Sequence, residues 1–244
     1  MPQSLYDNPD LYRRVFATDV DDAAFFSFMV PEDTLNPRIL DLACGPLPVG
    51  PVVARIHGGF AVGLDCIAQP GAAAAFVQAD AGALPFRSGS FDLIFSRLFG
   101  CAYAIGGGVN PSSIAKELRR CTASRGQVAL EVPLVNTPSK IVGLTETAQI
   151  EPGIAYCFQY LDVLHENGYG AILDSMITVR TEDATWEIHA PLQVFSPKGA
   201  AQWMAAMGFS VISFFAPYQI KSETSTPPED CLRGIVAGRR DYRC

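Results

Sequence analysis

Three aspartates stand at the ends of short apolar runs. Asp41 lies in the run ILDL, Asp65 closes the run FAVGL, and Asp80 follows the run AFVQA. A carboxylate in such a position can accept hydrogen bonds from both hydroxyls of a ribose, or from an exocyclic amine such as that of adenine. It can also simply cap the helix that follows. Three acids at three successive run ends favour a ligand site over three separate caps.

The residues after the first run form a tight turn of small side chains. Ala43, Cys44, Gly45 and Pro46 follow ILDL directly, and they leave room for a ligand to lie against the backbone. The later runs end on further polar residues, namely Ser96, Arg97 and Glu131. We expect all these groups to line one nucleotide-like site.

Alternating apolar runs and helical patterns predict an α/β fold with a mostly parallel sheet. Strand, helix and strand follow one another within about 30 residues, which is typical of a right-handed βαβ unit. Ligands in open parallel sheets bind at the carboxyl ends of the strands, so this fold brings the acids to one edge. The seven expected strands are 38–42, 60–64, 75–78, 91–95, 127–132, 209–215 and 232–238.

The segment 138–195 breaks this rhythm. Residues 172–181 and 185–195 alternate in hydrophobicity over part of their length, and 182–184 could join them as an antiparallel hairpin. At the other end of the chain, Asn8-Pro9 is a typical helix start. We therefore predict one domain over 1–244 that opens with a helix and carries an antiparallel β cap insertion at 138–195.

Composition narrows the class of protein. The chain has 244 residues, 49% of them hydrophobic, and a formal net charge of -7. This acidic balance argues against a nucleic-acid surface, which needs clustered Lys and Arg. The seven cysteines form no C-x-x-C pair, and no apolar run approaches the roughly 18 to 20 residues that span a bilayer. We expect a cytoplasmic protein that binds neither nucleic acid nor membrane.

The turn at 43–48 also bears on which cofactor is bound. A dinucleotide-binding site would carry G-x-G-x-x-G, but Ala43, Gly45 and Pro48 stand at the three glycine positions. A pyrophosphate would meet side chains and a proline there. A nicotinamide dinucleotide is therefore disfavoured, and a cofactor without phosphate fits the turn better.

Three stretches of the chain resemble motifs of the class I S-adenosylmethionine-dependent methyltransferases. They are ILDLACGP at 39–46, GLD at 63–65 and ADAGALPFRSGSFDLIFS at 79–96. The resemblance continues at 116–132 and 195–211, and covers most of the chain outside 138–195. It implies a Rossmann-like, seven-stranded, mostly parallel sheet with helices on both faces. It also implies S-adenosyl-L-methionine as cofactor and S-adenosyl-L-homocysteine as product.

The resemblance also implies roles for single residues. The turn after the first strand would line the methionine part of the cofactor, Asp65 would hold the ribose, and Asp80 with Ala81 would meet the adenine. The opening YDNPDLY is similar to an amino-terminal helix that closes over the cofactor, so 1–30 is expected to form a helical lid. The implied cofactor-binding residues are Tyr6, Tyr12, Asp41, Ala43, Cys44, Gly45, Pro46, Asp65, Cys66, Asp80, Ala81, Ser96 and Arg97.

Methyl transfer from a sulfonium is an in-line displacement, which depends on holding acceptor and methyl in line. It requires neither a metal nor a covalent nucleophile. A hydroxyl acceptor usually needs a general base, whereas an amine need only lose its proton. Among the three histidines, His189 is the candidate base, because it shares a strand face with Glu187 that meets either solvent or the pocket.

We therefore predict an enzyme that methylates an O or N atom of a small metabolite, as a monomer or homodimer. Acceptor specificity is expected in 138–195, in the first helix and in the loop 97–108. The alternative is a protein that binds the cofactor without transferring the methyl group. Leu47, where the first motif usually has another glycine, and the GGG at 106–108 keep this alternative open.

Overall fold

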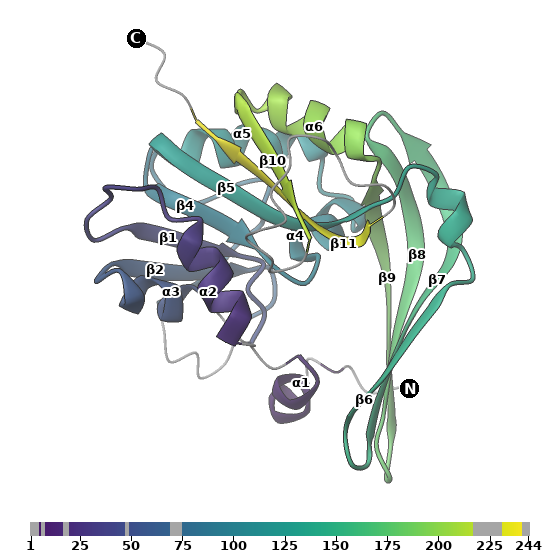
Figure 1. Cartoon of the computed structure of the whole chain (residues 1–244). Coiled ribbons are helices and arrows are strands. Elements are labelled where there is room, and N and C mark those ends of the chain that lie inside the picture. The colour runs from purple at the N-terminus through teal and green to yellow at the C-terminus, as the bar shows by residue number, and fades with distance from the viewer. Residues whose placement is uncertain are drawn as a thin grey trace.

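A seven-stranded sheet forms the centre of the protein in the computed structural model, which describes residues 5, 8–16, 20–46, 49–68, 75–216 and 231–240. The strand order is β3-β2-β1-β4-β5-β11-β10, and only β11 runs antiparallel to its neighbours (Figure 1). The predicted mostly parallel sheet is confirmed. The strands are β1 (Arg38–Leu42), β2 (Phe60–Asp65), β3 (Phe76–Gln78), β4 (Phe91–Ser96), β5 (Thr122–Leu134), β10 (Val211–Phe215) and β11 (Cys231–Arg239).

Helices cover both faces of this sheet, which explains why its strands are continuous apolar runs. Ile39 of β1 packs toward one face with Phe26 of α2 and Val53 of α3. Leu40 packs toward the other face, in one cluster with Leu118 of α5. The helices are α1 (Pro9–Val15), α2 (Val20–Phe28), α3 (Gly50–Ile56), α4 (Gly100–Gly106), α5 (Pro111–Cys121) and α6 (Pro197–Ala206). None of these helices, in the described part of the chain, is long and apolar enough to cross a membrane.

The segment after β5 extends the sheet by four antiparallel strands, which we call the cap sheet. It consists of β6 (Thr145–Glu151), β7 (Ile154–Asn167), β8 (Gly170–Arg180) and β9 (Thr185–Phe195), after the short 3₁₀ helix η2 (Pro138–Ile141). One parallel pair, Leu134 with Phe195, joins it to β5, so that eleven strands share one sheet. The cap sheet is long and twisted, and it lies beside the central sheet (Figure 1).

The sequence predicted only the β8–β9 hairpin of this cap sheet. β6 is an edge strand whose side chains are almost all exposed, so it lacks the half-buried alternation that marks a strand. β7 alternates over its first half, and its second half is mostly exposed. The two missed strands therefore carry little of the burial pattern that sequence reasoning depends on.

The first helix packs on the cap sheet and not on the central sheet. Leu11 and Val15 of α1 share a buried cluster with Val179 and Trp186 of β8 and β9. An ion pair between Arg14 and the carboxylate at 151 also joins α1 to β6. By contrast, α2 belongs to the cluster on the central sheet. Within 1–30, the two helices thus rest on different halves of the molecule.

The cap sheet approaches the central half closely at α4. A Cβ on Gly106 would lie 2.1 Å from the carbonyl oxygen of Pro191 on β9, far inside contact distance. Only glycine fits here without moving one of the two backbones. One glycine of the GGG run is thus required by packing.

Replacing Gly106 by Ala should therefore destabilise the protein, by roughly 1 to 3 kcal/mol or more, because a backbone contact must open. Urea unfolding monitored by circular dichroism measures the loss. Gly168→Ala is the matched control, since no heavy atom lies within 4 Å of an added Cβ there. Equal stability of the two variants would contradict the close approach of α4 and β9.

Candidate functional site

A cavity of about 730 Å³ lies at the carboxyl ends of β1 to β4, with the cap sheet and α1 on its other sides. Its volume falls in the range of roughly 300 to 1,000 Å³ that is usual for small-molecule sites. Nine of the residues singled out in the sequence line it. They are Tyr12, Ala43, Cys44, Gly45, Asp65, Cys66, Asp80, Ala81 and Arg97.

The other predicted site residues lie elsewhere. Asp41 and Ser96 are fully buried beneath the cavity wall, and Pro46 is outside the lining. Tyr6 lies outside the described residues. His189 is exposed on β9, and its neighbour Ile188 lines the cavity. Because successive side chains of a strand point to opposite faces, His189 faces away from the site.

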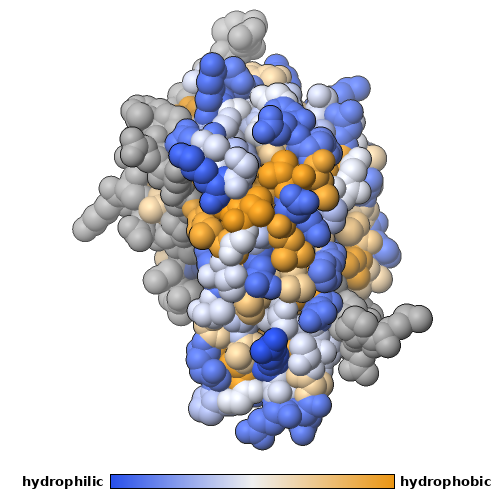
Figure 2. All heavy atoms as spheres, turned by 90° about the vertical axis from the view of Figure 1, so that its right-hand side faces the viewer, coloured by the Kyte–Doolittle hydropathy of each residue, from blue (hydrophilic) through white to orange (hydrophobic). Residues whose placement is uncertain are grey.

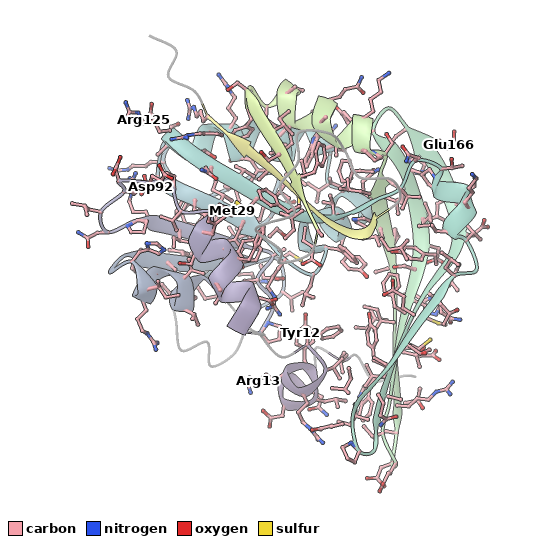
Figure 3. All side chains as sticks on the ribbon, viewed as in Figure 1. Tyr12, Arg13, Met29, Asp92, Arg125 and Glu166 are labelled. Atoms are coloured by element: carbon pink, nitrogen blue, oxygen red, sulfur yellow. The ribbon has the colours of Figure 1, made fainter. Side chains whose placement is uncertain are left out.

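The turn after β1 has a backbone conformation that small residues favour. Ala43 and Gly45 have φ angles of 52° and 56°, in the left-handed region. The amide of Gly45 donates a hydrogen bond of 2.8 Å to Oδ2 of Asp65. From the other side, Tyr12 points from α1 toward the central sheet (Figure 3), and its hydroxyl would lie 3.3 Å from a Cβ on Gly45. The turn is therefore held between Asp65 and Tyr12.

Asp41 holds the start of α3, which follows this turn in the chain. Its Oδ2 accepts hydrogen bonds from the amides of Val49 and Gly50, at 2.6 and 2.8 Å, where α3 begins. Its Oδ1 is buried and has no hydrogen-bond partner among the described atoms. Burial raises the pKa of Asp41 to about 7, against the opposing effect of the two amides. At Asp41 the capping interpretation of a strand-end acid is correct.

Asp65 and Asp80 present their carboxylates to the cavity from adjacent strand ends. Asp65 accepts from the amides of Gly45 and Ile67, one on each oxygen, and Oδ1 of Asp80 accepts from the amide of Gly82 at 2.6 Å. A carboxylate oxygen has two lone pairs. Both side chains therefore keep acceptor capacity for a ligand in the cavity.

The two cysteines of the lining are protonated thiols. Burial, reinforced by nearby carboxylates, raises the pKa of Cys44 and of Cys66 above the ordinary thiol value. Thiolates are the reactive form of cysteine, so neither side chain is set up as a nucleophile. They add small, neutral surface to the wall.

Arg97 is buried and paired. Its guanidinium forms an ion pair of 2.5 Å with Asp22 of α2, and the two side chains are 4% and 8% exposed. It also donates a hydrogen bond of 3.0 Å to the carbonyl of Phe16, at the end of α1. The sequence predicted Arg97 as a residue that lines the site and binds the cofactor. In the structure it ties the end of β4 to both amino-terminal helices, with its charge already balanced.

The loop that follows Arg97 is tightly constrained. Leu98 and Phe99 both have positive φ angles, 50° and 59°, a conformation that is costly for residues other than glycine. The amide of Leu98 donates a hydrogen bond of 2.7 Å to the buried Glu131, and the amide of Cys101 donates to Oγ of Ser96. These contacts explain the polar ends of β4 and β5. They hold the loop against the cavity.

Sequence reasoning predicted the segments that form the wall opposite the strand ends, 138–195 and 97–108, but did not predict which of their side chains line the cavity. Five of the side chains that line this wall are those of Tyr103, Glu146, Tyr156, Phe158 and Ile177. The alternation of aromatic residues at 156 and 158 was the available signal, because it places both on one face of β7. Nothing in the sequence told which face would meet the cavity.

Comparison with known proteins bears on this architecture. Residues 40–130 match the family model described as a methyltransferase domain. No curated protein matches the chain. Among solved structures, an S-adenosylmethionine-dependent methyltransferase from Clostridium acetobutylicum is 12% identical, with a TM-score of 0.68, and the match covers 95% of this chain and 97% of that one.

Two further structures are described as sugar-modifying enzymes. The sugar N-methyltransferase KedS8 from Streptoalloteichus is 17% identical, with a TM-score of 0.61 and coverage of 99% and 94%. CalS10, an amino pentose methyltransferase from Micromonospora echinaspora, is 15% identical, with a TM-score of 0.62 and coverage of 98% of both chains. Together the solved structures confirm the fold class expected from the sequence, and the family model agrees with the expected resemblance over residues 40–130.

The raised pKa of Asp41 predicts a pH-dependent stability. The folded-state pKa of about 7 exceeds the ordinary value of 3.8, so the folded protein holds the proton more tightly and loses stability as pH rises through this window. Asp41→Asn removes this loss. The free energy of unfolding of Asp41→Asn, minus that of the parent, should therefore rise between pH 4 and 7 by as much as about 4 kcal/mol. Urea unfolding at several pH values measures the difference.

The exposed Glu166→Gln variant is the control for that experiment, since it removes one carboxylate without burial. Its stability difference from the parent should stay flat over the same pH range. A flat difference for Asp41→Asn as well would show that the buried carboxylate does not titrate as proposed.

The Arg97–Asp22 pair predicts strong coupling between two positions. Arg97→Met removes the cation that faces the buried Asp22, and should cost roughly 3 to 5 kcal/mol. Asp22→Asn in the same protein should recover part of this loss, because the uncompensated charge is then gone. A double-mutant cycle by chemical denaturation measures the coupling. If the losses of stability in the two single variants simply add up in the double variant, the ion pair does not couple the two positions.

Proposed function

We propose that this chain, which has the fold of the class I S-adenosylmethionine-dependent methyltransferases, methylates an O or N atom of a small metabolite. The observation that carries the proposal is the convergence of the Gly45 turn, Asp65 and Asp80 on one cavity, at three neighbouring strand ends. The cap sheet closes the opposite side of that cavity. Cofactor and acceptor can therefore meet in one space.

The residues present suit S-adenosylmethionine. The turn at 43–45 leaves backbone exposed for the methionine part, Asp65 has acceptor capacity for the ribose hydroxyls, and Asp80 can accept from the adenine amine. No pyrophosphate has to be accommodated. The description of CalS10 as bound to S-adenosylmethionine supports this assignment.

The protein contributes to the reaction mainly by positioning the cofactor and the acceptor. When bound, the cofactor supplies an electrophilic methyl group, and the transfer is an in-line displacement. Asp41 holds the start of α3 next to the turn that would carry the methionine part, and Tyr12 covers that turn. Glu131 and Ser96 fix the loop on the acceptor side. A displacement of one wall against the other would lengthen the path between acceptor and methyl.

The acceptor side carries phenols and a carboxylate, and no described histidine lines it. Tyr103, Tyr156 and Glu146 are its titratable groups from the loop and the cap sheet. An amine acceptor needs only to lose a proton, whereas a hydroxyl would need one of these groups as a base. Because His189 faces outward, we do not retain it as the base. The small-molecule acceptor is supported by KedS8, which is described as a sugar N-methyltransferase.

Binding of S-adenosylmethionine, measured by calorimetry, tests the cofactor assignment. The intact protein should bind, and Asp65→Ala should bind at least about tenfold more weakly, because it loses hydrogen bonds to the ribose. Asp92→Ala is the matched control: Asp92 also lies on a strand of the central sheet, but at the start of β4, where it pairs with Arg38. No heat from the intact protein would overturn the assignment.

Product analysis tests the transfer itself. The protein, incubated with labelled cofactor and a panel of small metabolites, should form S-adenosylhomocysteine and a methylated product with at least one of them. Binding of the cofactor without any product across the panel would favour a protein that binds the cofactor and does not transfer the methyl group.

A further inference from the structure

The charges that line the cavity are unevenly distributed. The described lining residues include four carboxylates, those of Asp22, Asp65, Asp80 and Glu146, and a single cation, Arg97. Arg97 already pairs with Asp22 at 2.5 Å, and both side chains are buried. No described cation of the lining is therefore available to an anionic ligand. The electrostatic balance of the cavity favours positively charged ligands.

Two of the remaining carboxylates lie on the cofactor side. Asp65 and Asp80 stand at the ends of β2 and β3 and already accept hydrogen bonds from the backbone. Glu146 is different, because it comes from β6 of the cap sheet, across the cavity. Every other described cap residue of the lining is uncharged. Glu146 is thus the one charge that the described cap sheet presents to an acceptor.

The surroundings of Glu146 suit a cation. It stands directly opposite Phe158 on the neighbouring strand β7, at a separation that allows side chains to touch. Two positions along β7, Tyr156 lines the same wall, and the cavity is also lined by Phe99 of the loop after β4 and by Tyr103 of α4. An ammonium group gains from a carboxylate and from aromatic faces at the same time. No described lysine or arginine forms an ion pair with Glu146.

We propose that Glu146 is a specificity-determining residue, which selects acceptors that carry a positively charged amine and rejects acceptors that carry a carboxylate or phosphate. This inference rests on the proposed function, since it assigns the chemical class of the acceptor. It concerns the group that Glu146 holds, and leaves open which atom of the acceptor receives the methyl group. Glu146 is largely exposed, so it would hold the amine at the mouth of the cavity.

The cap sheet offers a matched control for this carboxylate. Glu187 lies on β9 with its side chain toward the outer face, in a separate hollow of about 420 Å³ beside Arg180 and Thr178. Figure 2 looks onto the outer side of the cap, where hydrophilic side chains surround an apolar band. Glu146→Gln and Glu187→Gln change the net charge equally, and only the first changes the cavity.

The experiment uses three probes that share one ring and linker and differ in charge: phenethylamine, phenethyl alcohol and hydrocinnamate. Their affinities for the protein saturated with S-adenosylhomocysteine are measured by calorimetry. The amine should bind at least about tenfold more tightly than the carboxylate. In Glu146→Gln the affinity for the amine should fall by roughly threefold to fivefold, as expected for an exposed charge pair, while Glu187→Gln should bind like the parent.

Any other result contradicts either the role of Glu146 or the proposed function. Absence of binding by all three probes, equal binding of all three, or an amine preference that is undiminished in Glu146→Gln would refute the selection of amines by Glu146. An equal loss in both variants would attribute the preference to net charge. If S-adenosylhomocysteine itself does not bind, the proposed function fails first, and the two failures are thereby distinguished.

Discussion

The carboxylate of Asp41 is buried beneath the cavity wall, and the start of α3 beside the first strand-end turn depends on it. Two backbone amides at the start of α3 are satisfied by one of its oxygens. A buried carboxylate is costly, and its raised pKa measures that cost. In return, the start of α3 beside the turn is held in one position. Asp65 and Tyr12 can then fix the turn from its two open sides.

The cavity exists because two sheets diverge from a shared line. β5 and β9 pair at one position, Leu134 with Phe195, and then separate. The close approach of α4 to β9 holds the two sheets together at one end, while α1 lies between them at the other (Figure 1). The space enclosed by these contacts has the central strand ends on one side and the inner face of the cap sheet on the other.

The central sheet could be predicted from the sequence because its strands are buried on both faces. Runs such as 39–42 and 60–64 consist almost entirely of apolar residues, and each has an acid within it or directly after it, so the strand ends and their acids were visible together. The cap sheet has one exposed face and an exposed edge, so β6 and β7 gave weaker patterns. Residues on one strand of such a sheet, such as Ile188 and His189, differ in role only through the face they occupy.

Side-chain pairing was beyond the reach of sequence reasoning for a different reason. Arg97 and Asp22 are 75 positions apart, and neither residue type indicates that the other neutralises it. The same holds for Glu131, whose carboxylate binds the amide of a residue on another strand's loop. Such contacts depend on how far each loop extends beyond the end of the sheet.

The single pair between Leu134 and Phe195 divides the hydrogen bonds of the protein into two nearly separate networks. Under the proposed function, the residues that would face a methyl donor belong to one network, and those of β6 to β9 that would face an acceptor belong to the other. Residues on the inner face of the cap sheet can therefore be exchanged without breaking any backbone ladder of the central sheet. A fold divided in this way can diversify its acceptors while it keeps a single way of holding the donor.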